Sequence, residues 1–328
     1  MSKPLIKTRN IFETAALLSL LFAAILLSTD RTYNAAVIDG IRLWAAAVLP
    51  ALFPYLVITS FISALRITGK ITAALSPFTE RLFYVNGAVG YALFISLMSG
   101  YPVGAKTVSD LKRANLIGDA ESERAAALCS SSSPVFLIGS VGNLTFNSPL
   151  FGLCLFLTHV LSVFIVGFVF SFYKRKEKPI KAPPLNASTS DNVLFDGVVS
   201  AVNSVLLVGG IITVFYLLTE MLTNLGVMKI LSGFFGLFTE NVALSSGIAN
   251  GFFECTRGLK IIAGGGISLF TLPVSAAICG FGGISVIAQS VAYLNKAKIK
   301  TAPFLLSKTL AATVNFGIGI IFSLLFFS

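Results

Sequence analysis

Residues 98–107 read MSGYPVGAKT, and the organisation of the whole chain follows from this run. It ends an apolar segment, residues 87–98, that is typical of a membrane-embedded helix. Two glycines and a proline then break the helix, and Lys106 follows the break. Lipid cannot satisfy the exposed backbone groups, so such a break persists only beside protein or a water-filled cavity. The run predicts either a broken helix that lines a solute site, or a helix that ends at the surface with Lys106 among the headgroups.

The composition indicates a polytopic membrane protein. Of 328 residues, 55% are hydrophobic and only 12% are charged, whereas soluble domains carry about 25% charged residues. The net charge of +10 therefore informs membrane topology, because basic residues gather in cytoplasmic loops. A nucleic-acid partner is not expected, since the chain has no basic, aromatic-rich soluble module. The expected surroundings are the lipid bilayer and a small-molecule solute.

Cysteine and histidine positions favour packing roles over chemistry. The single histidine, His159, lies in an apolar run. The four cysteines also lie in apolar runs and have no CxxC spacing: Cys129, Cys154, Cys255 and Cys279. We expect no metal site, no cofactor and no catalytic residue. No nucleophile–base pair or phosphate-binding loop is evident either, so an enzyme is not expected.

Three further segments predict other parts of the topology. Residues 1–41 are expected to form a membrane helix, over residues 11–28, followed by a short polar loop. Residues 107–124 are polar and mixed in charge, and predict a short solvated helix. Residues 174–196 form a basic linker, which the positive-inside rule assigns to the cytoplasm together with the N-terminus.

The remaining chain divides into two similar halves, residues 42–173 and residues 197–328. Short matches occur in the same order in both halves, among them Ser99-Gly100-Tyr101 with Asn250-Gly251-Phe252, and Ala126 to Cys129 with Ala276 to Cys279. The breaks then correspond as well, Gly100 to Lys106 with Gly251 to Gly258, and Ser130 to Pro134 with Gly280 to Gly283. We interpret this as an internal duplication.

Loop charges indicate that the two halves are inverted. The loop over residues 143–149 carries no charge, whereas its counterpart carries Lys296, Lys298 and Lys300. Opposite basic bias at matched loops implies opposite orientation in the membrane. The predicted fold is therefore an all-α polytopic membrane protein with two inverted-topology repeats that contain broken or re-entrant helices. Paired interruptions of this kind point to a transport site near the midplane.

The breaks supply the candidate substrate-binding residues. Helix N-termini offer free N–H groups and partial positive charge, and Lys106 and Arg257 would add two full charges. Together these groups would form an anion site. Glu254 would pair with Arg257 as a structural ion pair, take a coupling cation or proton, or bind a polar solute. The full candidate set is Gly100, Tyr101, Pro102, Lys106, Ser131, Ser132, Ser133, Asn250, Glu254, Arg257, Gly282, Gly283, Ser285 and Gln289.

Three runs carry a family resemblance. Residues 99–106 (SGYPVGAK), residues 131–134 (SSSP) with Phe136 and Gly139, and residues 280–286 (GFGGISV) with Gln289 resemble the YlbJ-like sporulation integral membrane proteins. These proteins belong to the nucleoside-recognition (gate) domain group. The resemblance extends from about Leu43 to the C-terminus. It implies a multi-pass protein of the cell membrane or the outer forespore membrane.

The resemblance and the charged breaks together predict a permease for a small, anionic solute. The implied role in sporulation is transport of dipicolinate into the forespore. Two alternatives stay open: a nucleoside-type carrier, which would use neutral hydrogen-bonding groups, and a non-transporting membrane scaffold for sporulation. The sequence leaves open the coupling ion and whether the protein forms a homo-oligomer.

Overall fold

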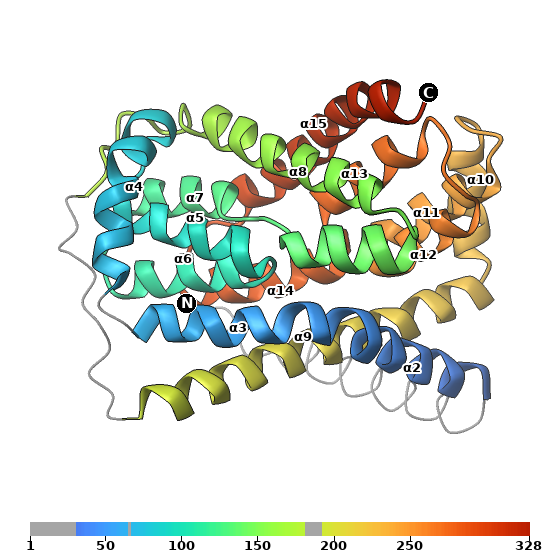
Figure 1. Cartoon of the computed structure of the whole chain (residues 1–328), viewed down its shortest axis with the longest axis horizontal. Helices are drawn as coiled ribbons and strands as arrows, with labels where there is room; N and C mark the ends of the chain where they lie inside the picture. Colours follow the sequence, from blue (N-terminus) through green and yellow to red (C-terminus); the bar gives the residue numbers. More distant parts are fainter. Residues whose placement is uncertain (1–30, 65–66, 181–191) are drawn as a thin grey trace, which may run out of the picture.

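The computed structural model describes residues 31–64, 67–180 and 192–328, and the regular structure in these ranges is entirely helical (Figure 1). The predicted first span, residues 11–28, lies outside them. The elements of the first part are α2 (Arg31–Leu43), the π-helix η1 (Trp44–Val48), α3 (Leu49–Ala64), α4 (Ile67–Phe83), α5 (Gly87–Ser99), α6 (Val103–Arg113), α7 (Asp119–Leu128), the π-helix η2 (Val135–Thr145) and α8 (Pro149–Phe170). The second part contains α9 (Val193–Asn224), α10 (Val227–Gly236), α11 (Val242–Phe253), α12 (Cys255–Gly264), α13 (Thr271–Phe281), α14 (Gly283–Lys296) and α15 (Ala302–Phe326).

Several helices can cross a membrane. Among the described residues, four helical segments are long and apolar enough, and there are up to six if each of two bent helix pairs counts as one span. One of these pairs is α4 with α5, whose axes differ by 96°. The prediction of a multi-pass, all-helical membrane protein is therefore confirmed.

The predicted polar loop before the first repeat is wrong where the structure describes it. Residues 31–43 form α2, which continues through η1 into α3 and packs along α9. Close packing accounts for the helix: Ala36 and Gly40 are buried, and a Cβ on Gly40 would lie 3.0 Å from the Thr213 Cα. The polar residues of α2 occupy its other faces, so polarity alone gave a misleading signal for a loop.

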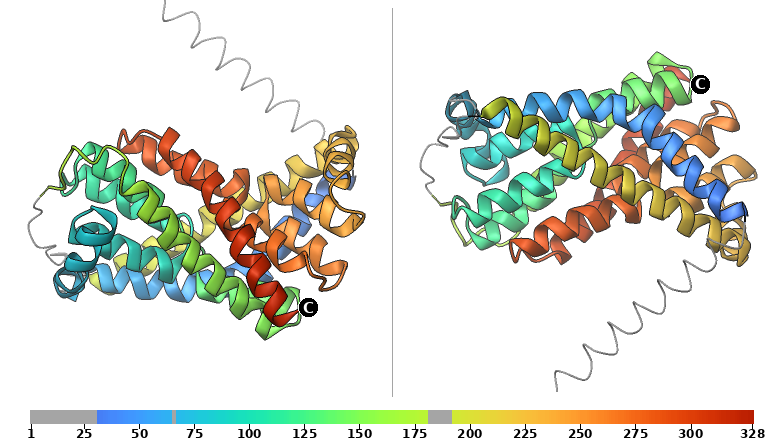
Figure 2. Two further views of the ribbon diagram at one scale, coloured as in Figure 1. Left: turned by 90° about the horizontal axis from the view of Figure 1, so that it is seen from above. Right: turned by 90° about the horizontal axis from the view of Figure 1, so that it is seen from below.

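The same succession of elements occurs in both halves. In the first, α3, α4, α5, α6, α7, η2 and α8 follow one another, and α9 to α15 repeat this order with similar breaks. Figure 1 shows that matched helices run in opposite directions along the long axis. The chain runs from right to left in α3 and α8, and from left to right in α9 and α15. Figure 2 shows α8 and α15 crossing, and they are in direct contact. Two inverted repeats with broken helices are thus present.

Matching asparagines define the register between the repeats. Asn86 caps α5, and Asn241 caps α11, each by accepting hydrogen bonds from the backbone N–H groups two and three residues later. This alignment places Gly100 opposite Cys255, and the C-caps of the two helices, Gly100 and Glu254, agree with it to within one residue because α11 is one residue shorter than α5. The sequence comparison paired Gly100 with Gly251, which is four residues before Cys255, because short apolar matches shift easily by about one helical turn.

Two hairpins enter the molecule from opposite ends. Helices α5 and α6 pack together at one end, α11 and α12 at the other, and their tips meet near the middle (Figure 1). Each tip packs closely on the second break of its own half. A Cβ on Gly100 would lie 2.8 Å from the Ser133 backbone nitrogen, and one on Gly283 would lie 3.1 Å from the Cys255 backbone nitrogen. Both glycines have positive φ, so each position also disfavours a larger residue.

The predicted solvated helix at residues 107–124 is wrong at its C-terminal end. Glu121, Glu123 and Arg124 are all buried. The Glu121 carboxylate accepts the Asn86 backbone N–H at 2.6 Å, and Arg124 donates to backbone carbonyls after α8. Lys174 Nζ lies 2.9 Å from Glu123, and this hydrogen-bonded contact raises the pKa of the Lys174 ammonium. These polar side chains tie α7 to the start of the linker, so their charges serve internal contacts.

The inverted arrangement predicts which engineered cysteines share a side of the membrane. Lys176→Cys and Lys300→Cys should react with an impermeant maleimide from one side, and Glu240→Cys from the other, because the corresponding loops lie at opposite ends (Figure 1). The four native cysteines are buried, so the background should be low. Labelling of Lys176→Cys and Lys300→Cys from opposite sides would contradict the inverted topology.

The close packing of the hairpin tip predicts a sensitive glycine. Gly100→Ala combines a φ of +79° with a Cβ placed 2.8 Å from the Ser133 nitrogen, and should cost at least about 1–3 kcal/mol of stability. Gly233→Ala is the matched control, because nothing lies within 4 Å of its Cβ. The control should be neutral or stabilise α10 by up to about 1 kcal/mol. Thermal unfolding in detergent compares the two, and equal melting temperatures would show that the tip tolerates a side chain.

Candidate functional site

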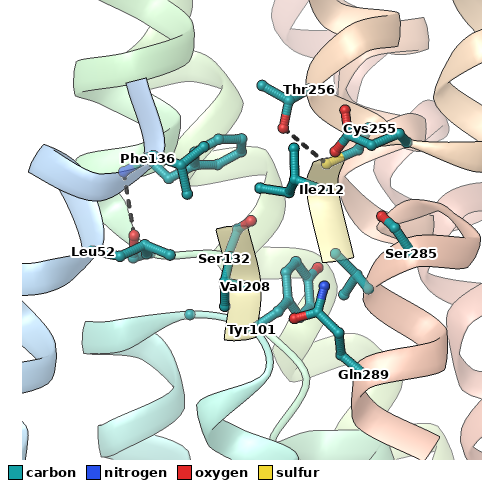
Figure 3. Close-up of a pocket in the computed structure, with 15 residues that line it drawn as sticks. Leu52, Tyr101, Ser132, Phe136, Val208, Ile212, Cys255, Thr256, Ser285 and Gln289 are labelled. Carbon is teal, nitrogen blue, oxygen red and sulfur yellow. Dashed lines mark hydrogen bonds between the residues drawn. The ribbon is translucent and has the colours of Figure 1, made fainter. Parts of the chain in front are cut away.

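A pocket lies where the broken helices of both halves meet (Figure 3). Its cavity volume of about 50 Å³ is enough for several water molecules. Side chains from α9 and the η1–α3 region form one apolar wall, and the broken ends form the polar part. Its lining is Val48, Leu52, Gly100, Tyr101, Ser132, Ser133, Phe136, Val208, Ile212, Glu254, Cys255, Thr256, Ser285, Val286 and Gln289.

Helix N-termini supply hydrogen-bond donors at this pocket. No side chain caps α14, whose first residues include Ser285 on the pocket wall. At the opposite break, Ser133 precedes η2, and its Oγ accepts the Phe136 backbone N–H at 3.2 Å. The Ser285 hydroxyl is buried and has no hydrogen-bond partner among the described residues. A solute that offers an acceptor or a donor to Ser285 would satisfy this group.

Tyr101 connects the two halves across the pocket. It follows Gly100 at the first break, and its hydroxyl donates to the Cys279 carbonyl at 2.8 Å. Behind its ring lies Lys308 of α15, which is only 1% exposed. The Lys308 Nζ donates to the Tyr101 hydroxyl at 3.3 Å and to the Ser130 hydroxyl at 3.2 Å. A buried lysine amine thus lies directly against a pocket residue.

His159 makes a specific hydrogen bond to the serine run, in addition to the packing role expected from the sequence. Its Nε2 accepts the Ser132 backbone N–H at 2.9 Å. Because Nε2 is the acceptor, the neutral ring carries its proton on Nδ1, which has no partner among the described residues. His159 therefore satisfies a backbone group freed by the break and fixes the position of the serine run.

The two charged residues at the tip of the second hairpin, Glu254 and Arg257, make different contacts. Glu254 lines the pocket and caps α12, since its Oε2 accepts the Arg257 backbone N–H at 2.6 Å. The Arg257 guanidinium lies 2.8 Å from Glu220 and stacks over the Tyr216 ring. The ion pair of Arg257 is therefore with Glu220, and the expected side-chain pair with Glu254 does not form. Sequence proximity favoured the nearer carboxylate, but α12 points the guanidinium toward α9.

Lys106 lies beside the pocket, on the same hairpin as Tyr101. Its Nζ donates to the Ser200 hydroxyl of α9 at 3.3 Å. Together with Tyr101 and Pro102 it lines a smaller adjoining cavity of about 10 Å³. The lysine is thus near the break, as predicted, but separate from the main pocket wall.

The structure brings half of the predicted site residues together. The main pocket contains Gly100, Tyr101, Ser132, Ser133, Glu254, Ser285 and Gln289, and the adjoining cavity contains Pro102 and Lys106. The other five candidates lie outside both linings. The Ser131 backbone donates to Ser96, the Asn250 side chain donates to Ser246, Arg257 pairs with Glu220, and Gly282 and Gly283 form the backbone of the break.

Two residues at the site were missed by the sequence analysis. His159 gave no signal beyond an isolated polar residue in an apolar run. Lys308 gave a stronger one, because an ionisable residue inside a membrane span indicates function by default. It lies within α15, a segment in which the sequence analysis named no candidate residue. The apolar wall from α9, including Val208 and Ile212, depends on tertiary packing and has no sequence motif.

Comparisons with known proteins agree with a helical fold of this kind in a membrane. No family model matches the chain. It is 29% identical, over 296 residues, to the sporulation integral membrane protein YlbJ of Bacillus subtilis (strain 168), covering 83% of this chain and 72% of YlbJ.

Solved structures of CNTnw have the same fold. A doubly substituted form in an outward-facing state gives a TM-score of 0.62 at 14% identity, covering 98% of this chain and 88% of CNTnw. An inward-facing, substrate-bound state gives 0.60 at 13% identity, covering 98% and 86%. The predicted resemblance is confirmed: this chain is a multi-pass integral membrane protein that is similar to the sporulation protein YlbJ and has the fold of CNTnw.

Proposed function

We propose that this protein is a permease that carries a small polar solute through the pocket between its two inverted halves. The observation that supports this most strongly is the meeting of broken helix ends from both halves at one polar pocket. Such ends are costly in a membrane unless they serve a cavity. CNTnw has been solved facing outward, and facing inward with substrate. A carrier must open its solute site to each side of the membrane in turn, and the fold that this chain shares with CNTnw supports such a pair of states here.

We infer that the solute is a small aromatic dicarboxylate such as dipicolinate. The apolar wall, with Leu52, Phe136 and Ile212, suits a flat ring. The uncapped N-terminus of α14 suits a carboxylate, because its N–H groups and dipole favour negative charge. Lys308 adds a positive charge behind Tyr101. The sporulation membrane relative supports a role in spore formation.

A nucleoside-type solute is the second candidate, and one observation favours it. The hydrogen-bonding side chains on the pocket wall are mostly neutral, and the charged one is the carboxylate Glu254. A dianion must avoid Glu254, whereas a nucleoside could donate hydrogen bonds to it. Arg257 and Lys106, the cations expected to bind an anion, lie outside the main pocket. The solute class is therefore the first question for transport assays.

The basic loops support an orientation with the linker in the cytoplasm. Asp119 lies near both Lys174 and Lys300, so the linker and the loop before α15 share one end of the molecule. Basic residues concentrate on the cytoplasmic side. In this orientation, α5 and α6 enter from the cytoplasmic side, and α11 and α12 enter from the opposite side (Figure 1).

The proposed function predicts which class of solute is taken up. Proteoliposomes with purified protein should take up labelled dipicolinate in a saturable way and should take up little labelled uridine. Saturable uridine uptake without dipicolinate uptake would favour the nucleoside-type carrier. If neither solute is taken up, and sporulating cells lose a partner's localisation when the protein is removed, the non-transporting scaffold is the better account.

The proposed site also predicts that Ser285 contributes to solute binding. Ser285→Ala removes a buried hydroxyl that has no partner, so stability should be unchanged or slightly higher. Solute affinity should fall roughly fivefold, the loss of one hydrogen bond of about 1 kcal/mol. Ser275→Ala is the matched control, because that serine is also buried without a partner but does not line the pocket. Equal uptake by both variants would exclude Ser285 from the solute site.

A further inference from the structure

Lys308 lies where several breaks converge. Its Nζ contacts Tyr101 at the tip of the first hairpin and Ser130 at the start of the serine run. A Cβ on Gly282, the break of the second half, would lie 3.6 Å from the same nitrogen. The Nζ also lies 4.3 Å from the centroid of the Tyr101 ring, within the range of a cation–π contact. A change of charge on Lys308 therefore alters the electrostatic potential at the breaks of both halves.

No carboxylate among the described residues forms an ion pair with Lys308. The titratable groups that face it are Tyr101, His159, Cys255 and Cys279, and all of these are ordinarily uncharged when buried. Glu254 on the pocket wall is used as the cap of α12. An isolated buried ammonium is costly, because neither lipid nor apolar side chains replace its hydration. The empty pocket thus favours the neutral amine.

An anion in the pocket reverses this preference. Tyr101 lines the pocket and contacts the Lys308 Nζ, and these surroundings are buried, so a negative charge in the pocket attracts the ammonium more strongly than in water. We propose that Lys308 binds a proton when an anionic solute fills the pocket and releases it when the solute leaves. The carrier would then move at least one proton together with each anion. This inference rests on the proposed function, anion transport.

The step balances simply. The neutral amine of Lys308 accepts one proton from a hydronium ion: an N–H bond forms, an O–H bond breaks, and a neutral water molecule is left. On release the ammonium returns the proton to water, which becomes hydronium again. A second small cavity, of about 10 Å³, lies behind Lys308 and offers room for about one water molecule. Its polar lining is Ser130, His159, Ser162, Ser307 and Asn315. Both His159 and Asn315 line this cavity, and the His159 Nδ1 and the Asn315 Oδ1 have no partners among the described residues.

The test uses proteoliposomes with the full chain, dipicolinate as solute and a pH-sensitive dye inside. Wild-type protein should carry protons inward only when dipicolinate is present. With one proton per anion, and the membrane potential clamped at zero, a gradient of one pH unit should drive roughly tenfold accumulation. Lys308→Arg keeps a permanent positive charge. It should still exchange dipicolinate, but its accumulation should no longer respond to the pH gradient.

Two further variants separate coupling from stability. Lys308→Met removes the charge at similar length, and should lower dipicolinate affinity at least tenfold. Lys229→Met, on the exposed side of α10, should behave as wild type in every assay. Abundance and thermal unfolding of each variant are measured alongside.

The outcomes distinguish the two proposals. Dipicolinate uptake without proton movement in wild type, or unchanged pH response in Lys308→Arg, overturns the role of Lys308 and leaves anion transport intact. The same pH response in both proteins would also show that the proton travels on the solute itself. Absence of dipicolinate uptake in wild type overturns both proposals.

Discussion

A helix that breaks inside a membrane leaves backbone groups that lipid cannot satisfy, and the rest of this structure depends on how they are satisfied. The Ser132 N–H reaches the ring of His159, and the Ser131 N–H reaches the Ser96 hydroxyl. The Cys279 carbonyl accepts the Tyr101 hydroxyl from the other half. Each break is therefore held by side chains from other helices. The Ser285 hydroxyl, beside the second break, remains without a partner among the described residues and lines the pocket, so the site and the breaks coincide.

Charged side chains near the breaks are likewise compensated by contacts with other groups of the protein. Arg257 is paired with Glu220, Glu254 caps a helix, and the carboxylates of α7 bind backbone and linker groups. Each of these charges has a partner or a helix dipole that offsets its burial. Lys308 is the exception within the part of the chain that the structure describes, since it contacts only hydroxyl groups and a ring. A charge without a structural counterpart is best explained by a counterpart that comes and goes with the solute.

The sequence predicted the architecture better than the details of the site. Hydrophobic runs, paired breaks and loop charges were enough for an inverted-repeat membrane fold, because they follow from the bilayer itself. The predicted register between the repeats was wrong by four residues, since apolar matches carry little information, whereas the asparagine caps Asn86 and Asn241 mark it clearly. The serine run, Tyr101 and Ser285 were found because breaks need such residues. The partner of Arg257 and the wall from α9 could not be predicted, because they depend on how distant helices pack.

The most direct test of the account is an experimental structure of the protein saturated with dipicolinate. We expect ligand density in the pocket between the two breaks, with one carboxylate near the N-terminus of α14 and Ser285, and the ring against Phe136 and Ile212 (Figure 3). Density at a different place, or an unoccupied pocket under conditions in which the protein transports dipicolinate, would contradict the central claim that the meeting of the broken helices is the solute site.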